Sequence, residues 1–77
     1  MNKIVFRFYE IKNNDFFEVS FDSRLSFIDN FRLLNDIYFI PINTIHIYDE
    51  TSKSFLDMDI PIEKFGFYHY NKLFLFD

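Results

Sequence analysis

The N-terminal part of the chain alternates between apolar and polar residues with a period of two, which is typical of β-strands with one buried face. In residues 3–11 one face holds Ile4, Phe6 and Phe8, and the other holds Val5, Arg7 and Tyr9. In residues 16–22 the apolar face holds Phe17, Val19 and Phe21, opposite Glu18, Ser20 and Asp22. Between these segments, Lys12-Asn13-Asn14-Asp15 has turn composition, because Asn and Asp tolerate left-handed backbone. The pattern predicts a β-hairpin.

The period then changes to that of a helix. The apolar residues spaced four and three apart are Phe27, Phe31 and Leu34. Polar residues fill the positions between them, so we expect an amphipathic helix. Ser26 precedes it and Asp29 follows three positions later, which resembles a capping box with Asp in place of the usual Glu or Gln. The helix must end before Pro41, because proline disfavours helical backbone at the preceding residue.

Alternation returns in residues 44–49, which predicts a third strand. Its inward side chains are Ile45 and Ile47, and its outward ones are His46 and Tyr48. The polar residues 49–54 predict a turn, and residues 55–58 predict a short edge strand.

The C-terminal part predicts a helical turn and a last strand. Residues 61–65 favour a single helical turn, and Gly66, the only glycine, suits a left-handed position directly after it. Residues 72–76 are apolar on both strand faces, so this strand cannot lie at an edge and must be central. Pairing it in parallel with the first strand gives a mixed sheet with one helix on one face, which is an α+β fold of the β-grasp type.

In this order the elements resemble ubiquitin over almost the whole chain. The apolar positions of ubiquitin's last turn and strand are matched by Ile62, Phe65, Phe67, Leu73 and Leu75. Gly66 falls where ubiquitin has a residue with positive φ, and Ile40-Pro41 matches the pair after its helix. Phe21-Asp22-Ser23 followed by Phe27-Ile28-Asp29-Asn30 is similar to its entry into the helix. The resemblance implies a single ubiquitin-like domain over residues 1–77.

Among small bacterial ubiquitin-like proteins, the chain resembles the YukD/EsaB family of type VII secretion systems. The segments that carry this resemblance are residues 17–21 and 62–67. The sequence ends at Asp77 without the Gly-Gly tail through which ubiquitin is conjugated, so conjugation and sulfur transfer are not expected. The family implies a bacterial, cytoplasmic accessory protein that binds a membrane component of the secretion apparatus. An adaptor or phage-encoded inhibitor that binds an unrelated protein is the alternative.

Composition and charge narrow the function further. The chain has no Ala, one Gly, 13 Phe and 5 Tyr, a bias that AT-rich codons also produce, so aromatic content alone carries no functional meaning. The net charge is −4 and basic residues are scattered, which argues against nucleic-acid binding. The longest apolar stretch, residues 37–42, is too short to span a bilayer, and no signal peptide is apparent. A cytoplasmic protein is therefore expected.

The candidate site is the outer face of the sheet, opposite the helix. The residues expected there are Val5, Arg7, Tyr9, His46, Tyr48, Phe74 and Phe76. Contiguous exposed apolar surface with aromatic and Arg side chains is typical of protein-binding sites. A homodimer through the same face and a mere effect of composition stay open as alternatives.

The sequence suggests neither a metal centre nor an active site. There is no Cys, and the two histidines, His46 and His69, are expected in an exposed strand and in a loop. Asp57 and Asp59 would share a strand face but need a pocket to act as an acid–base pair. With one glycine, a phosphate-binding loop is not expected either. We therefore predict a non-enzymatic protein without a cofactor.

Overall fold

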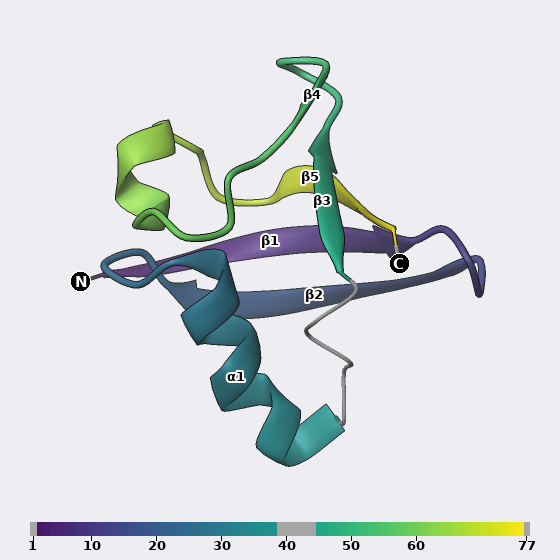
Figure 1. Cartoon of the computed structure of the whole chain (residues 1–77), viewed down its shortest axis with the longest axis horizontal. Helices are drawn as coiled ribbons and strands as arrows, with labels where there is room; N and C mark the ends of the chain where they lie inside the picture. Colours follow the sequence, from purple (N-terminus) through teal and green to yellow (C-terminus); the bar gives the residue numbers. More distant parts are fainter. Residues whose placement is uncertain (1, 39–44, 77) are drawn as a thin grey trace.

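The computed structural model describes residues 2–38 and 45–76, which form a five-stranded mixed sheet on one α-helix (Figure 1). The elements in chain order are β1 (Lys3–Glu10), β2 (Asp15–Asp22), α1 (Phe27–Tyr38), β3 (His46–Asp49), β4 (Ser54–Phe55), the 3₁₀ helix η2 (Ile62–Phe65) and β5 (Asn71–Phe76). The strand order is β2-β1-β5-β3-β4. Strands β1 and β5 run parallel, and the other neighbouring pairs are antiparallel. This is the predicted β-grasp arrangement.

The hairpin of β1 and β2 forms as the alternation predicts. Phe8 faces Phe17 in the register, and both belong to the face that packs on the core. The turn is one residue earlier than expected, since Ile11–Asn14 form it and Asp15 already pairs with Glu10. Asn14 adopts φ 49°, the left-handed backbone that Asn tolerates better than most residues.

Helix α1 begins at the predicted cap. The Ser26 hydroxyl accepts a hydrogen bond from the backbone N–H of Asp29 at 3.1 Å, so it satisfies one of the free amides of the first turn. The buried Asn30 then ties the helix to the end of β2: its carbonyl oxygen accepts the N–H of Asp22 at 2.9 Å, and its amide donates to the Asp22 carbonyl at 3.0 Å. The predicted helix end at Pro41, with the pair Ile40-Pro41, lies outside the described residues.

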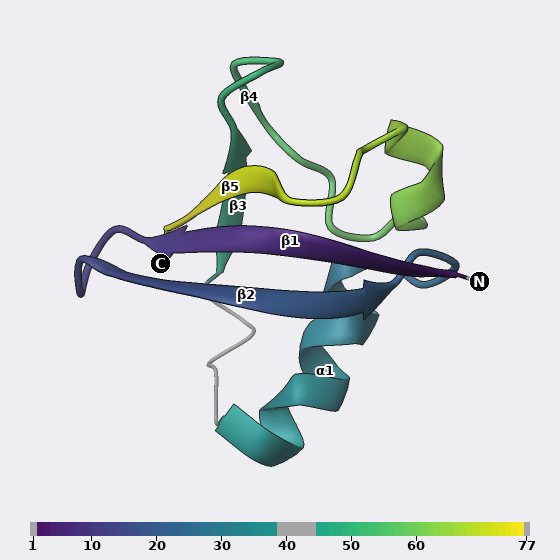
Figure 2. The ribbon, with the colours of Figure 1, turned by 180° about the vertical axis from the view of Figure 1, so that it is seen from behind.

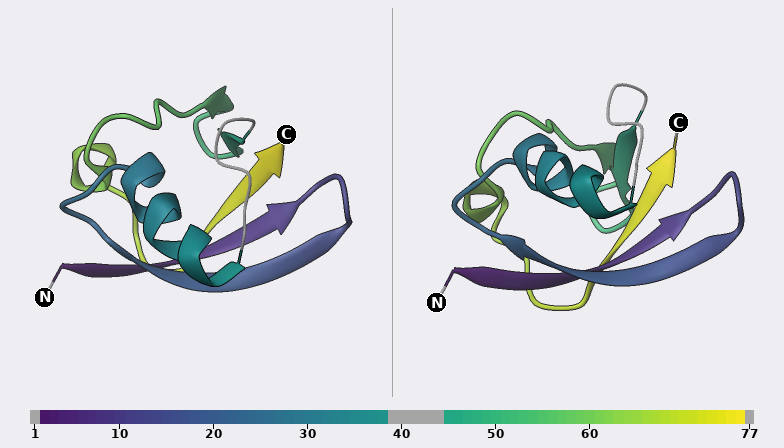
Figure 3. Two further views of the ribbon diagram at one scale, coloured as in Figure 1. Left: turned by 60° about the horizontal axis from the view of Figure 1, so that its bottom comes forward. Right: turned by 90° about the horizontal axis from the view of Figure 1, so that it is seen from below.

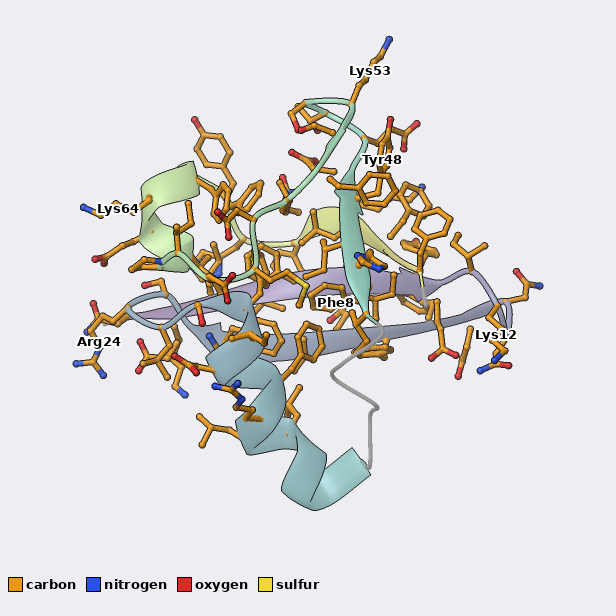
Figure 4. All side chains as sticks on the ribbon, viewed as in Figure 1. Phe8, Lys12, Arg24, Tyr48, Lys53 and Lys64 are labelled. Atoms are coloured by element: carbon orange, nitrogen blue, oxygen red, sulfur yellow. The ribbon has the colours of Figure 1, made fainter. Side chains whose placement is uncertain are left out.

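The core between sheet and helix is largely aromatic. The phenylalanines with 0–1% exposure are Phe6, Phe8, Phe21, Phe27 and Phe31. Their ring centroids lie 5.2–6.5 Å apart in the contacting pairs, with tilted or edge-to-face geometry of the kind that aromatic pairs prefer. Figure 3 shows the sheet curling around α1, and Phe8, labelled in Figure 4, contacts Phe21 of β2 and Phe31 of α1.

Strand β5 is central, as its apolar character on both faces predicts. It lies between β1 and β3, and Leu73 and Leu75 are buried in the core at 0% and 5% exposure. Phe74 and Phe76, which alternate with them, therefore belong to the other face of the sheet.

The segment from the end of β3 onwards agrees with the prediction at Asp49 and differs from it at β4. Asp49 ends β3, as the alternation over residues 44–49 predicts, so the turn predicted over residues 49–54 begins after it; Asp49 is buried at 4% exposure, and its carboxylate accepts the N–H of Thr51 at 3.2 Å. Strand β4 has two residues rather than four, because the chain bends soon after Phe55. Asp57 accepts the N–H of Asp59 at 2.9 Å in that bend, so the expectation that Asp57 and Asp59 share a strand face is wrong.

The helical turn before the last strand is confirmed. Helix η2 spans Ile62–Phe65, and Gly66 follows in the left-handed conformation at φ 71° and ψ 31°. The N–H of Ile62 donates to the carbonyl of Leu25 at 3.0 Å, which holds this turn beside the entry to α1. Within residues 2–38 and 45–76, we find no helix with the length and hydropathy needed to cross a membrane.

Candidate functional site

The outer face of the sheet is the face turned away from α1. Viewed from behind, β1, β2 and β5 lie in front of the helix (Figure 2). The structure places all seven predicted site residues on alternate positions of β1, β3 and β5, out of phase with the core positions. Exposed members of the set are Arg7, His46 and Phe76, and partly buried ones are Val5, Tyr9, Tyr48 and Phe74.

Strand pairing aligns aromatic residues into one row across this face. Tyr9 of β1 pairs with Phe16 of β2 and with Phe74 of β5. Tyr48 of β3 pairs with Phe74 and with Phe55 of β4. Every strand therefore contributes one ring, and we call these five residues the aromatic row: Phe16, Tyr9, Phe74, Tyr48 and Phe55.

Contacts between rings join the row into two continuous parts. One part is Phe16, Tyr9 and Phe74, and the other is Tyr48 and Phe55. The centroid of Tyr9 lies 5.2 Å from that of Phe16 and 5.8 Å from that of Phe74. On the other side, Tyr48 and Phe55 are 5.2 Å apart in a T-shaped pair. The two end members, Phe16 and Phe55, are 51% and 61% exposed, so the row reaches solvent at both edges of the sheet.

Phe76 and His46 extend the surface on the β3 side of the row. The Phe76 ring is 37% exposed and lies 5.9 Å from that of Phe55, and the His46 ring lies 6.4 Å from Phe55. A shallow depression of about 390 Å³ adjoins them; its lining residues are Ile11, Tyr48, Glu50, Lys53, Phe74 and Phe76. Tyr48 and Lys53 can be located at this end of the molecule in Figure 4. Three aromatic rings and Ile11 line it, so it offers an apolar surface to a side chain of a partner.

Two cations lie against aromatic rings: Lys72 against the aromatic row, and Arg7 beside it against Tyr70. Arg7 forms an ion pair with Glu18 at 3.0 Å, and its guanidinium lies 5.2 Å from the centroid of the Tyr70 ring. The ammonium of Lys72 lies 4.7 Å from the centroid of Tyr9 and 5.1 Å from that of Phe74, within the range of cation–π attraction.

Val5 lies away from the aromatic row. It pairs with Ser20, and its neighbours are the turn residues before β5: its N–H donates to Nδ1 of His69 at 3.2 Å, and its carbonyl accepts the N–H of Tyr70 at 2.6 Å. His69 thus lies in a loop, as expected, and fixes the backbone of β1. The centre of the candidate site is at Tyr9 and Phe74, and not at Val5.

Sequence reasoning missed Phe16, Phe55 and Lys72. Phe16 and Phe55 belong to edge strands, and their membership of the row depends on the strand register, which alternation alone does not give. Lys72 is part of the predicted last strand, residues 72–76, whose pattern gives it no role in the site. A search for exposed aromatic residues at outward positions of all the predicted strands would have found Phe16.

One ion pair among the described residues perturbs a carboxyl group, that of Asp22 with Arg24. In the described ranges, no three His, Cys, Asp or Glu side chains are grouped so that they could hold a metal ion. Hydrogen bonds from the Arg24 side chain and backbone lower the pKa of Asp22 from 3.8 to about 2. The two side chains meet at 2.8 Å at the end of β2, beside the entry to the helix.

Comparison with known proteins identifies the fold. No family model matches the chain, and no curated protein does. Among solved structures, the ubiquitin-like domain of Plasmodium falciparum Dsk2 aligns over 95% of both chains with a TM-score of 0.75 and 16% identity. The ubiquitin-like domain of the Arabidopsis thaliana protein At2g32350 aligns over 99% of this chain and 78% of that chain, with a TM-score of 0.77 and 16% identity.

A third structure, ATBAG1 in complex with HSP70, aligns over 96% of this chain and 40% of that chain, with a TM-score of 0.76 and 15% identity. Likenesses at this level of identity reflect shared backbone geometry, and a shared fold does not fix function. They agree with the mixed five-stranded sheet and its single helix. The chain therefore has the ubiquitin-like β-grasp fold.

Proposed function

We propose that the chain is a protein-binding module that contacts its partner through the aromatic row and Phe76. The observation that carries this proposal is the alignment of one aromatic residue from each of the five strands on the face opposite the helix. These rings add nothing to the core, which is filled by the opposite face of the sheet.

The composition of the surface supports the proposal. Protein-binding sites are enriched in Tyr, Phe and Arg, and contiguous apolar surface on a soluble protein usually marks an interaction site. Here Tyr, Phe and Arg lie together, with a depression beside Phe74 and Phe76 that suits an anchoring side chain. One of the similar structures, ATBAG1, is of a complex with another protein, so the fold is compatible with such a role.

For the partner, we propose a membrane component of a bacterial type VII secretion apparatus, with the chain acting as a cytoplasmic accessory protein. The support is the resemblance of residues 17–21 and 62–67 to the corresponding family segments. The alternative is an adaptor or inhibitor that binds a soluble protein of another system through the same face. Capture from native cells separates the two, because the first predicts a membrane-embedded secretion subunit and the second a soluble target.

The test replaces the two outward phenylalanines of β5. The Phe74→Ser, Phe76→Ser double variant should no longer capture the partner from native lysate, while it still unfolds cooperatively. The matched control is Leu33→Ser, which also removes an exposed apolar side chain, 61% exposed, but from the helix layer. Capture should survive in the control.

Capture that survives in the double variant would exclude this face as the binding site. Light scattering on the unmodified chain tests the homodimer alternative separately. A dimer that the double substitution converts to a monomer would assign the aromatic row to self-association.

A further inference from the structure

The position of Lys72 limits which charged group the partner's surface presents at the centre of the aromatic row. It is exposed, lies on the central strand, and holds its ammonium over the rings of Tyr9 and Phe74 in the middle of the aromatic row. Any partner that covers these rings must also cover this charge. A buried ammonium is costly unless an opposite charge compensates it, so the covering surface has to supply a carboxylate at this point.

The neighbouring cation is already compensated. Arg7 is next to Lys72 in the register of β1 and β5, but its guanidinium is paired with Glu18 at 3.0 Å. The molecule as a whole carries a net charge of −4, which disfavours a strongly acidic partner. The complementary surface is therefore one carboxylate within an apolar stripe, rather than a broad acidic patch.

The direction of the aromatic row indicates which type of secondary structure the partner presents to it. Its three central rings, Tyr9, Phe74 and Tyr48, lie on adjacent strands, so the row crosses the strands. Two strand spacings of about 4.8 Å give roughly 10 Å, the rise of about seven helical residues. A helix laid across the strands can meet all three rings with side chains at i, i+4 and i+7. An added strand would instead pair with an edge and run along the strands.

We infer that the partner presents an amphipathic helix along the aromatic row with one carboxylate against Lys72, and that Lys72 selects the partner by this charge. The inference rests on the proposed function of the same face. It names a residue outside the seven that the sequence suggests, and it commits to one occupant. A second copy stacked on this face about a two-fold axis that runs along β5 would bring two Lys72 ammonium groups together, which disfavours that arrangement.

The experiment uses two stapled helical peptides of about 14 residues as probes, each with Leu at i, i+4 and i+7 on one face. One peptide carries a Glu beside the central Leu and the other carries a Lys at the same position. Each is titrated into the isotope-labelled chain and followed by NMR chemical-shift changes, at low and at high salt. The variants are Lys72→Met and Lys72→Glu, and the matched control is Lys64→Glu, an exposed lysine on η2 far from Tyr48 (Figure 4).

We expect the Glu peptide to bind at least about 10-fold more tightly than the Lys peptide at low salt, since one attractive pair replaces one repulsive pair against an ammonium that the peptide covers. The shifts should follow β1, β5 and β3 at the row. Lys72→Met should abolish the preference but retain binding, Lys72→Glu should reverse it, and Lys64→Glu should leave it unchanged. High salt should reduce the preference.

Several results would overturn the inference: no binding of either peptide, equal binding of both, or an equal effect of Lys64→Glu and Lys72→Glu, which would indicate net charge alone. Shifts confined to the edge of β2 would indicate strand addition, and shifts that depend on chain concentration without peptide would indicate a second copy. The proposed function fails separately, if the Phe74→Ser, Phe76→Ser variant still captures the natural partner.

Discussion

Truncation of Phe8 tests whether the two faces of the sheet have different roles. Phe8 has 0% exposure, and its ring centroid lies 5.6–6.5 Å from those of five other phenylalanines. Those neighbours come from β1, β2 and α1: Phe6, Phe17, Phe21, Phe27 and Phe31. Phe8→Ala therefore opens a cavity where sheet and helix meet.

The expected loss is large relative to the stability of a chain this small. Phe→Ala substitutions in cores cost about 3–5 kcal/mol in the free energy of unfolding. At roughly 0.05–0.15 kcal/mol per residue, 77 residues give a total of about 4–12 kcal/mol. Phe8→Ala is thus expected to bring the fold to the edge of stability. Phe8→Leu, which keeps much of the volume but loses the ring contacts, should cost about 1–2 kcal/mol.

The matched control is Phe16→Ala, a substitution one register position away but on the outer face. Phe16 is 51% exposed and contacts Tyr9 at 5.2 Å, so its loss should cost about 0.5–1 kcal/mol, the worth of one aromatic pair. Urea unfolding followed by circular dichroism measures all three variants. If Phe16→Ala destabilises the chain as much as Phe8→Leu or more, the outer row contributes to the core, and the separation of the two faces is wrong.

Three further predictions concern the helix cap at Ser26, the left-handed backbone at Gly66 and the ion pair of Asp22 with Arg24. Ser26→Ala removes the acceptor of the Asp29 N–H and should cost about 1 kcal/mol in urea unfolding, whereas Ser26→Asp should retain most of the stability. Gly66→Ala meets no atom within 4 Å, so its only penalty is the left-handed backbone at φ 71°; we expect a loss of about 1–2 kcal/mol, with a smaller loss for Gly66→Asn. Because the folded-state pKa of Asp22 is lowered from 3.8 to about 2, its ionised form stabilises the fold above about pH 4, and this contribution is lost as the pH falls from 4 to 2. Arg24→Gln should raise the Asp22 pKa toward 3.8 in an NMR titration; a carboxyl that stays near 2 would contradict the assigned cause.

The sequence predicts the fold well because local pattern and tertiary packing agree in most elements. Phe6 and Phe8 alternate with Val5, Arg7 and Tyr9, and the structure buries both phenylalanines. The doubly apolar segment around Leu73 lies at the centre of the sheet, and the single glycine adopts the left-handed conformation. For the phenylalanines and the segment around Leu73 the requirement is burial of apolar side chains, and for Gly66 it is a positive φ. Each requirement fixes where the residue lies in the fold.

The errors occur where a side chain competes with regular backbone pairing. Residues 55–58 are sufficiently apolar for a strand, but the last backbone bond to β3 is the one that the Leu56 N–H donates to the Ile47 carbonyl at 2.8 Å, and directly after it Asp57 accepts the N–H of Asp59 in a bend. Asp49 belongs both to the predicted strand over residues 44–49 and to the predicted turn over residues 49–54; in the structure it pairs with Leu73 at the end of β3, and its buried carboxylate accepts the N–H of Thr51. Such local bonds depend on side-chain conformations that periodicity does not encode.

The candidate site was predictable in part, for a related reason. Alternation assigns each residue to a face, so Tyr9, Tyr48 and Phe74 were expected on the outer side. It does not say which residues of different strands are neighbours, because that depends on the register. The places of Phe16 and Phe55 in the row and the contact of Lys72 with two rings therefore appear only once the strands are paired, although alternation alone assigns Phe16 to the outer face.

The aromatic residues of this chain have two origins, a biased composition and a role in binding, and their positions in the structure distinguish the two. A biased composition supplies many rings, and it would place them on exposed positions of the helix as readily as on those of the sheet. Both aromatic side chains described in α1, Phe27 and Phe31, are instead fully buried, whereas Phe16 and Phe55 on the outer sheet face are more than half exposed. Composition also has no means of bringing one ring from every strand into register. That alignment, and not the number of aromatic residues, is what supports a binding role for this face.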